Sequence, residues 1–152
     1  MRIMFVCHGT ICRSTMAEYV MKHMVAQKGL SERFFITSSA TSTEEIGNGV
    51  HYGTRNKLKE KGVPCGDHRA VQLTRADFDQ YDYIIGMDSA NLRNMRRILK
   101  SEDAKVCLLL DFTDRKGDSI ADPWYTGNFE ETYQDVTEGC QALLKKILEE
   151  NL

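Results

Sequence analysis

The sequence predicts a three-layer, doubly wound α/β fold in which a four-stranded parallel sheet carries helices on both faces. Short apolar runs that suit buried strands alternate along the chain with longer segments that have helical periodicity. Strands separated by helices form right-handed βαβ units, and their parallel strands are covered on both faces. A chain of 152 residues fits one such domain, so we expect residues 1–152 to fold as a single unit.

The N-terminal part predicts a strand, a helix and a second strand. The run IMFV at 3–6 is too short for a helix and contains no polar residue, so it suits a buried strand. Ser14 is a residue type that caps helices, and Glu18 follows early in the helix, where a negative charge is favourable. Gly29 favours the end of this helix, and the second strand is expected near 34–38.

The later elements continue the alternation. A helix over 51–61 is bounded by Gly62, with Pro64 just beyond it. Apolar runs predict strands, and periodic segments between and after them predict helices. The remaining expected elements are a strand at 82–87, a helix at 89–100, a strand at 106–110 and a helix at 130–149.

Cys7 and Arg13 lie just after the first predicted strand, with five residues between them. Gly9 permits a sharp turn, and successive backbone N–H groups before a helix can form a concave nest for a dianion. We therefore expect a phosphate loop after the first strand. Its expected substrate-binding residues are His8, Gly9, Thr10, Ile11, Cys12 and Ser14.

The two ends of this loop carry the chemistry. Inward N–H groups, the helix dipole and a nearby arginine favour the thiolate of Cys7, which makes it a candidate nucleophile. The planar fork of Arg13 can hold two phosphoryl oxygens, and the hydroxyl of Ser14 can donate to the sulfur. From the residues alone, Cys7 could also be a small buried apolar residue, and Ser14 only a helix cap.

The loop sequence VCHGTICRS resembles the phosphate loop of the low-molecular-weight protein tyrosine phosphatases. Four further blocks are similar to later blocks of that family and occur in the same order. They are SSATSTEEIGNGVH at 38–51, HRAVQL at 68–73, YDYIIGMDSANLR at 81–93 and DPWY at 122–125. The resemblance covers nearly the whole chain, and it implies hydrolysis of protein phosphotyrosine and small aryl phosphates through a phosphocysteine.

Asp122 is the candidate general acid, because the departing oxygen needs a proton. An Asp-Pro pair usually only starts a turn, but here Pro123 would stiffen a loop that faces the phosphate loop. Trp124 and Tyr125 would then supply aromatic walls for a flat substrate ring. The DP motif of the family implies the same role for Asp122.

The resemblance also implies that Ser39, His68 and Asp88 brace the phosphate loop through hydrogen bonds. Taken alone, these residues suit a strand end, a surface histidine and a helix cap. His51 and Cys65 lie near His68 in the sequence, but their spacings are irregular for a metal site. We expect no metal ion and no other cofactor.

Two departures from the family pattern lie in or next to the loop. Thr10 stands where the family has Asn, and Thr15 where it has Pro. A β-branched residue resists left-handed backbone, so Thr10 is expected to store about 1 to 3 kcal/mol of strain if it adopts the family conformation. His8 and Glu44 are expected at the cleft rim, where other members often carry apolar residues.

Composition excludes several classes of protein. A formal net charge of -2 does not favour a nucleic-acid or membrane-surface binder. We find no signal peptide and no apolar run long enough to span a membrane, and the five cysteines lack a compact spacing. We expect a cytoplasmic monomer or weak homodimer whose partners are phosphotyrosine proteins.

Three other functions stay open. A protein-arginine phosphatase shares the loop, but that branch carries a small polar residue where Ile11 stands. An arsenate reductase of this fold needs further cysteines to relay a disulfide, and residues 66–106 contain none. A phosphate-binding adaptor without turnover is the third alternative.

Overall fold

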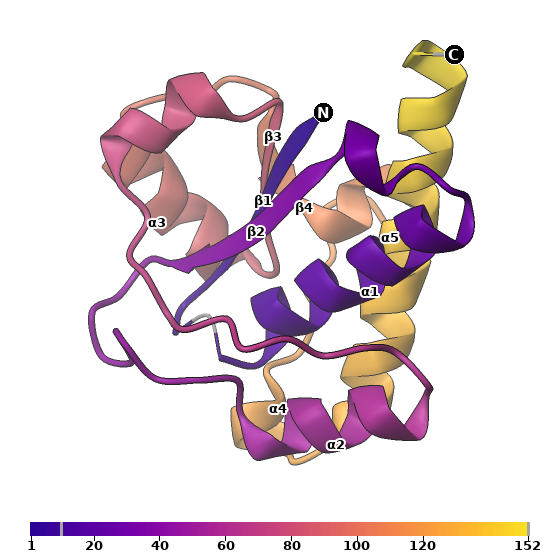
Figure 1. The fold of residues 1–152 in the computed structure, drawn as a ribbon. Helices are drawn as coiled ribbons and strands as arrows, with labels where there is room; N and C mark the ends of the chain where they lie inside the picture. The colour runs from indigo at the N-terminus through magenta and orange to yellow at the C-terminus, as the bar shows by residue number, and fades with distance from the viewer. Residues whose placement is uncertain (10, 152) are drawn as a thin grey trace.

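The computed structural model describes residues 1–9 and 11–151 and contains one parallel sheet. Its strands are β1 (Arg2–Cys7), β2 (Phe35–Ala40), β3 (Tyr83–Gly86) and β4 (Val106–Leu108), in the order β2-β1-β3-β4 (Figure 1). The predicted four-stranded parallel sheet is therefore confirmed. Among the described residues, no helix is both long enough and apolar enough to cross a membrane.

Helices cover both faces of this sheet, as predicted. One face packs against α1 (Arg13–Gln27) and α5 (Phe129–Asn151), and α2 (Tyr52–Glu60) packs beside these helices. The other face packs against α3 (Ser89–Leu99) (Figure 1). The central strand shows why both faces are apolar. Ile3, Phe5 and Cys7 join one core, whereas Met4 and Val6 join the other.

The order of the strands explains where a ligand can bind. The chain leaves β1 for β2 on one side and later returns to β3 on the other side of β1. Such a reversal opens a crevice at the carboxyl end of the central strand. Cys7 is the last residue of β1, so it lies at this point.

Four short elements were not predicted: η1 (Ser31–Arg33), η2 (Arg75–Gln80), η3 (Leu109–Phe112) and α4 (Pro123–Thr126). The predicted strand at 106–110 is too long by two residues, because Leu109 and Leu110 belong to η3. The carboxylate of Asp111 accepts a hydrogen bond from the N–H of Leu108 at 3.0 Å, which turns the chain at that point.

The start of α1 also differs from the prediction. Ser14 does not cap the helix: α1 begins at Arg13, and no side chain caps its N-terminus. The hydroxyl of Ser14 lies instead 3.1 Å from the sulfur of Cys7. The first turn contains no acidic residue, and Glu18 is buried, where Ser38 donates to it at 2.6 Å and Lys22 at 2.6 Å. Glu18 is therefore stabilised by side chains rather than by the end of the helix.

Candidate active site

A narrow cleft of about 100 Å³ opens at the carboxyl end of β1. It gathers side chains from the loop after β1, the start of α1, the segment after β2 and the start of α4. The lining residues are Cys7, His8, Gly9, Ile11, Cys12, Arg13, Glu44, Glu45, Asp122, Trp124 and Tyr125. The three residues predicted to be catalytic, Cys7, Arg13 and Asp122, therefore line one cleft. The described residues predicted to bind the substrate also line it, except Ser14, which contacts Cys7.

The backbone of the loop is fixed by neighbouring segments. The carbonyl oxygens of Cys7, His8 and Ile11 accept hydrogen bonds from the N–H groups of residues 41, 42 and 51 at 3.0, 3.1 and 2.8 Å. In a trans peptide the C=O and the following N–H point in opposite directions. The N–H groups that follow these carbonyls therefore point away from the surrounding scaffold, as an anion-binding nest requires. Thr10 lies outside the described residues, so its expected strain stays a prediction.

Cys7 and Ser14 are both buried, and their sulfur and hydroxyl oxygen are 3.1 Å apart. The cysteine is only 3% exposed, although it lines the cleft. A substrate can therefore reach the sulfur only through the cleft. A hydroxyl at this distance can donate to a thiolate and stabilise its negative charge.

Arg13 is held through its two terminal nitrogens. One terminal nitrogen donates to Asp88 at 2.7 Å and to the carbonyl of Ile120 at 2.9 Å, and the other lies 3.5 Å from Asp122. Its Nε is buried and has no hydrogen-bond partner among the described residues. Burial opposes the charge, but Cys7, Asp88 and Asp122 outweigh it and raise the pKa of Arg13. The structure thus holds a charged guanidinium with unused donor capacity beside the sulfur.

Asp122 is positioned by the segment that precedes α4 and by α4 itself. Its carboxylate caps this short helix, accepting the N–H of Trp124 at 3.0 Å. Two hydrogen bonds hold the segment before Asp122. The N–H of Ile120 donates to the carbonyl of Met87 at 2.8 Å. The hydroxyl of Thr132 donates to the carbonyl of Ala121 at 3.1 Å. These contacts keep the carboxyl group at the cleft.

Cys12 and Ile11 line the cleft but are largely covered by their neighbours. Both pack in a small buried cluster with Ala70. Burial, and next the charge of Cys7, raise the pKa of Cys12 to about 12. Cys12 is therefore a protonated thiol at neutral pH and does not compete with Cys7 for attack on a phosphoryl group.

Asp88 contacts Arg13, the last residue of the candidate phosphate loop. It accepts from Arg13, and its other carboxylate oxygen accepts the N–H of Asn91 at 2.7 Å, which caps α3. The side chain of Asp88 therefore both caps α3 and contacts Arg13.

Ser39 and His68 do not contact the loop within the described part of the chain. The hydroxyl of Ser39 donates to the sulfur of Met4 at 3.0 Å, on the face of the sheet that carries α3. His68 lies 3.5 Å from the buried carboxylate of Glu18, and its backbone N–H donates to the hydroxyl of Tyr19 at 2.9 Å. The strand alternation turns Ser39 toward Met4. The bracing roles expected for Ser39 and His68 stay predictions.

Aromatic side chains stand at the mouth of the cleft. Trp124 is 56% exposed and Tyr125 is 83% exposed. His51 was considered as a metal ligand from the sequence, and its irregular spacing argued against that role. Its ring packs edge-on against Trp124 with ring centroids 5.5 Å apart. Its Nδ1 accepts the N–H of Gly53 at 3.0 Å and so caps α2. His51 therefore supports the aromatic wall.

Sequence analysis missed two contributors to the site. Glu45 lines the cleft beside Glu44, and the carbonyl of Ile120 accepts from Arg13. Glu45 lies within the block at 38–51 that resembles the family, but that resemblance assigns it no role. A backbone carbonyl such as that of Ile120 has no side-chain signal in the sequence. The expected rim residues His8 and Glu44 do meet at the cleft, with Nε2 and Oε2 3.1 Å apart.

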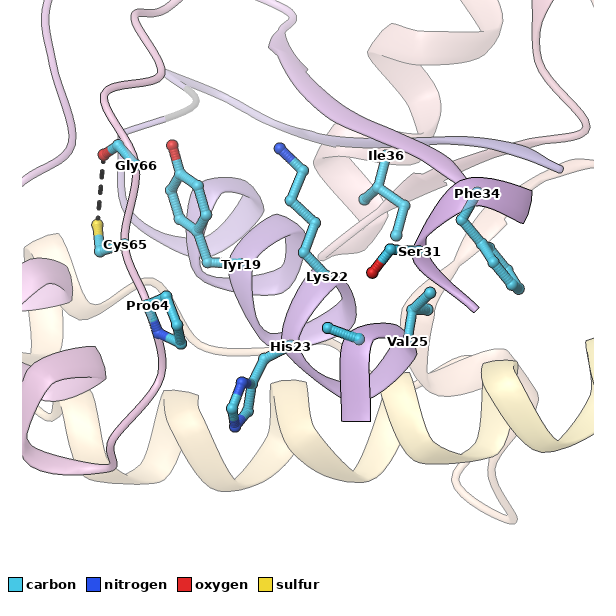
Figure 2. A pocket seen from close by; sticks show the side chains of 11 residues that line it. Tyr19, Lys22, His23, Val25, Ser31, Phe34, Ile36, Pro64, Cys65 and Gly66 are labelled. Atoms are coloured by element: carbon cyan, nitrogen blue, oxygen red, sulfur yellow. Dashed lines mark hydrogen bonds between the residues drawn. The ribbon is translucent and has the colours of Figure 1, made fainter. Parts of the chain in front are cut away.

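A larger cavity of about 530 Å³ lies between α1, η1 and residues 64–66. Figure 2 shows Tyr19 and Lys22 projecting from α1, with Pro64 and Cys65 on the neighbouring segment. Burial raises the pKa of Cys65, which makes it a poor nucleophile, and the described residues that line this cavity include no arginine. The cavity therefore lacks the sulfur and guanidinium pair that the cleft at Cys7 brings together.

Comparison with known proteins gives a direct result. The family model for low molecular weight phosphotyrosine protein phosphatase matches residues 2–152. The chain belongs to this family. The human low molecular weight phosphotyrosine protein phosphatase is 40% identical over 151 residues, which cover 95% of this chain and 94% of the human one.

Solved structures of the family agree with the fold. The crystal structure of YfkJ from Bacillus subtilis matches with a TM-score of 0.95 and 36% identity, covering 100% of this chain and 97% of that one. The structure of DARP, a Drosophila arginine phosphatase, matches with a TM-score of 0.85 and 28% identity, covering 96% and 97%. The predicted fold class, the predicted family and the predicted enzyme class, protein-tyrosine phosphatase, are confirmed.

Proposed function

We propose that this low molecular weight phosphatase hydrolyses phosphotyrosine in proteins, and small aryl phosphates, through a phosphocysteine intermediate on Cys7. The observation that carries the proposal is the buried Nε of Arg13, which has no partner in the described residues and lies in the same cleft as Cys7. A bound phosphoryl group supplies the missing acceptor. The planar fork of Arg13 can then follow the group as it flattens in the transition state.

In the first step, the thiolate of Cys7 attacks phosphorus, an S–P bond forms and the P–O bond to the aryl group breaks. Asp122 donates its proton to the departing oxygen. This step requires that Asp122 carries a proton when the substrate is bound. Trp124 and Tyr125 flank the departing ring.

In the second step, water attacks phosphorus while the Asp122 carboxylate accepts its proton. The S–P bond breaks and the Cys7 thiolate returns. The hydroxyl of Ser14, 3.1 Å from the sulfur, stabilises the negative charge as it develops. Arg13 holds the phosphoryl oxygens in both steps, and the proposed route uses no metal ion.

Hydrolysis of p-nitrophenyl phosphate and of a phosphotyrosine peptide in EDTA tests this function, with Cys7→Ser as the matched control. We expect turnover of both substrates by the wild-type protein only. Binding of phosphate without turnover would instead identify a phosphate-binding adaptor.

We also propose a cytoplasmic location, a single catalytic domain over residues 1–152, and a monomer or weak homodimer. Cys12, Cys65, Cys107 and Cys140 are free thiols, which suits a reducing compartment. Burial raises the pKa of Cys107 to about 12 and raises that of Cys140 as well. Thiols with raised pKa values do not favour the disulfide relay that an arsenate reductase needs.

The similarity to DARP makes hydrolysis of phosphoarginine the second candidate function. Ile11 argues against it, because a branched apolar side chain suits an aromatic ring and crowds a planar, polar guanidinium. We expect a higher kcat/KM for phosphotyrosine than for phosphoarginine peptides, and Ile11→Thr should narrow the gap. Val71→Thr, at an exposed position outside the cleft lining, is the control. An excess of phosphoarginine hydrolysis by the wild-type protein would reverse the assignment.

Cys12 is expected to protect the nucleophile from irreversible oxidation. Peroxide oxidises the Cys7 thiolate to a sulfenic acid, and the Cys12 thiol attacks that sulfur to form a disulfide and release water. Dithiothreitol then restores the thiolate. We expect peroxide-treated Cys12→Ser protein to recover less activity than wild type in dithiothreitol. Equal recovery would mean that Cys12 only packs in the loop.

A further inference from the structure

The rim of the cleft carries exposed negative charge and no exposed lysine or arginine among its described residues. The side chain of Glu44 is 71% exposed, and Glu45 stands next to it in the lining. Arg13 also lines the cleft, but its side chain is only 3% exposed and already faces Asp88 and Asp122. Of the basic side chains in the lining, only His8 is exposed.

Both carboxylates are held against the phosphate loop. Glu45 packs on Gly9 so closely that a Cβ at this glycine would lie 3.1 Å from the Cγ of Glu45. The Glu45 carboxylate also accepts from the side chain of Asn48 at 2.5 Å. Glu44 lies 3.1 Å from the ring nitrogen of His8. The charges therefore have a defined position beside the phosphate site.

The same cleft has two exposed aromatic side chains, Trp124 and Tyr125. The face of an aromatic ring attracts a cation, and a guanidinium can stack on it. A lysine or arginine next to a bound phosphotyrosine would therefore meet carboxylates and aromatic faces. An aspartate or glutamate there would meet Glu44 and Glu45, and the described residues that line the cleft include no exposed lysine or arginine to offset the repulsion.

We propose that Glu44 and Glu45 are specificity-determining residues that select phosphotyrosine segments with arginine or lysine next to the phosphotyrosine and disfavour acidic neighbours. This inference rests on the proposed function, since it concerns the substrate of the same cleft. The carboxylates act on the flanking side chains and take no part in the transfer of the phosphoryl group.

The test compares three phosphotyrosine peptides of equal length that carry arginine, alanine or glutamate on both sides of the phosphotyrosine. We expect kcat/KM to fall in that order. Because exposed charge pairs are individually weak, the ratio between the arginine and glutamate peptides should be about three- to tenfold at low salt. It should approach one at about 1 M salt, where the Debye length is roughly 3 Å.

For every variant, the readout is the kcat/KM of the arginine peptide divided by the kcat/KM of the glutamate peptide. Changes in overall activity cancel in this ratio. Glu44→Gln combined with Glu45→Gln should bring the ratio close to one. Glu32→Gln combined with Glu102→Gln removes the same number of charges at exposed positions outside the cleft lining, and it should preserve the ratio. A wild-type ratio near one, or a ratio that survives the double substitution, contradicts the proposal. Failure of wild type to hydrolyse the alanine peptide would instead overturn the proposed function, and this inference with it.

Discussion

Cys7→Ser protein should retain less than about one per cent of wild-type turnover of p-nitrophenyl phosphate while still binding inorganic phosphate. A serine hydroxyl is almost fully protonated at neutral pH and cannot replace the thiolate as nucleophile. Phosphate binding should persist, because it depends on Arg13 and on backbone N–H groups that the substitution leaves in place. Steady-state kinetics give the turnover, and isothermal titration calorimetry gives the phosphate affinity.

Cys107→Ser is the matched control. Cys107 lies in β4 outside the cleft lining, and burial raises its pKa to about 12, so it is a thiol at neutral pH. Its substitution should leave the turnover of p-nitrophenyl phosphate close to that of the wild-type protein. Turnover above the one per cent level in Cys7→Ser protein would point to another nucleophile, and loss of phosphate binding would show that the sulfur itself supports the nest.

The fold was predictable because its strands and long helices are marked by apolar patterns that depend only on neighbouring residues. The run at 3–6 and the periodic segment of α5 are examples. The short α4 was missed because four residues cannot show a helical period. The sequence suggested two roles for Ser14, a helix cap and a hydroxyl donor to the sulfur of Cys7. The structure places the hydroxyl 3.1 Å from that sulfur and shows no side-chain cap on α1.

The site was predictable to the extent that its chemistry is local or belongs to a motif. Cys7 and Arg13 are fixed by their spacing around one loop, and Asp122 by the DP motif. The contact between Arg13 and the carbonyl of Ile120 joins segments 107 residues apart, and no side-chain pattern encodes it. Glu45 reaches the cleft only because the chain after β2 folds over the loop, so its position also required the structure.

Asp122→Ala should slow the hydrolysis of phenyl phosphates with basic leaving groups by about 10² to 10⁴-fold, which is the usual range for general acid catalysis. Phosphates whose leaving groups are acidic should be affected far less, since their oxygen departs without a proton. The measurement is kcat across a series of aryl phosphates, plotted against the pKa of the leaving group. Wild type should show a shallow dependence and the variant a steep one.

Asp118→Ala is the control for this series, because Asp118 lies four residues earlier, outside the cleft lining, and its side chain is 59% exposed. It should keep the shallow dependence of wild type. Asp122 also lies 3.5 Å from Arg13, so its loss could weaken activity by disturbing the guanidinium. That effect would lower the rates of all aryl phosphates by the same factor. Equal losses across the series would therefore remove Asp122 from the acid role and leave it as a residue that positions Arg13.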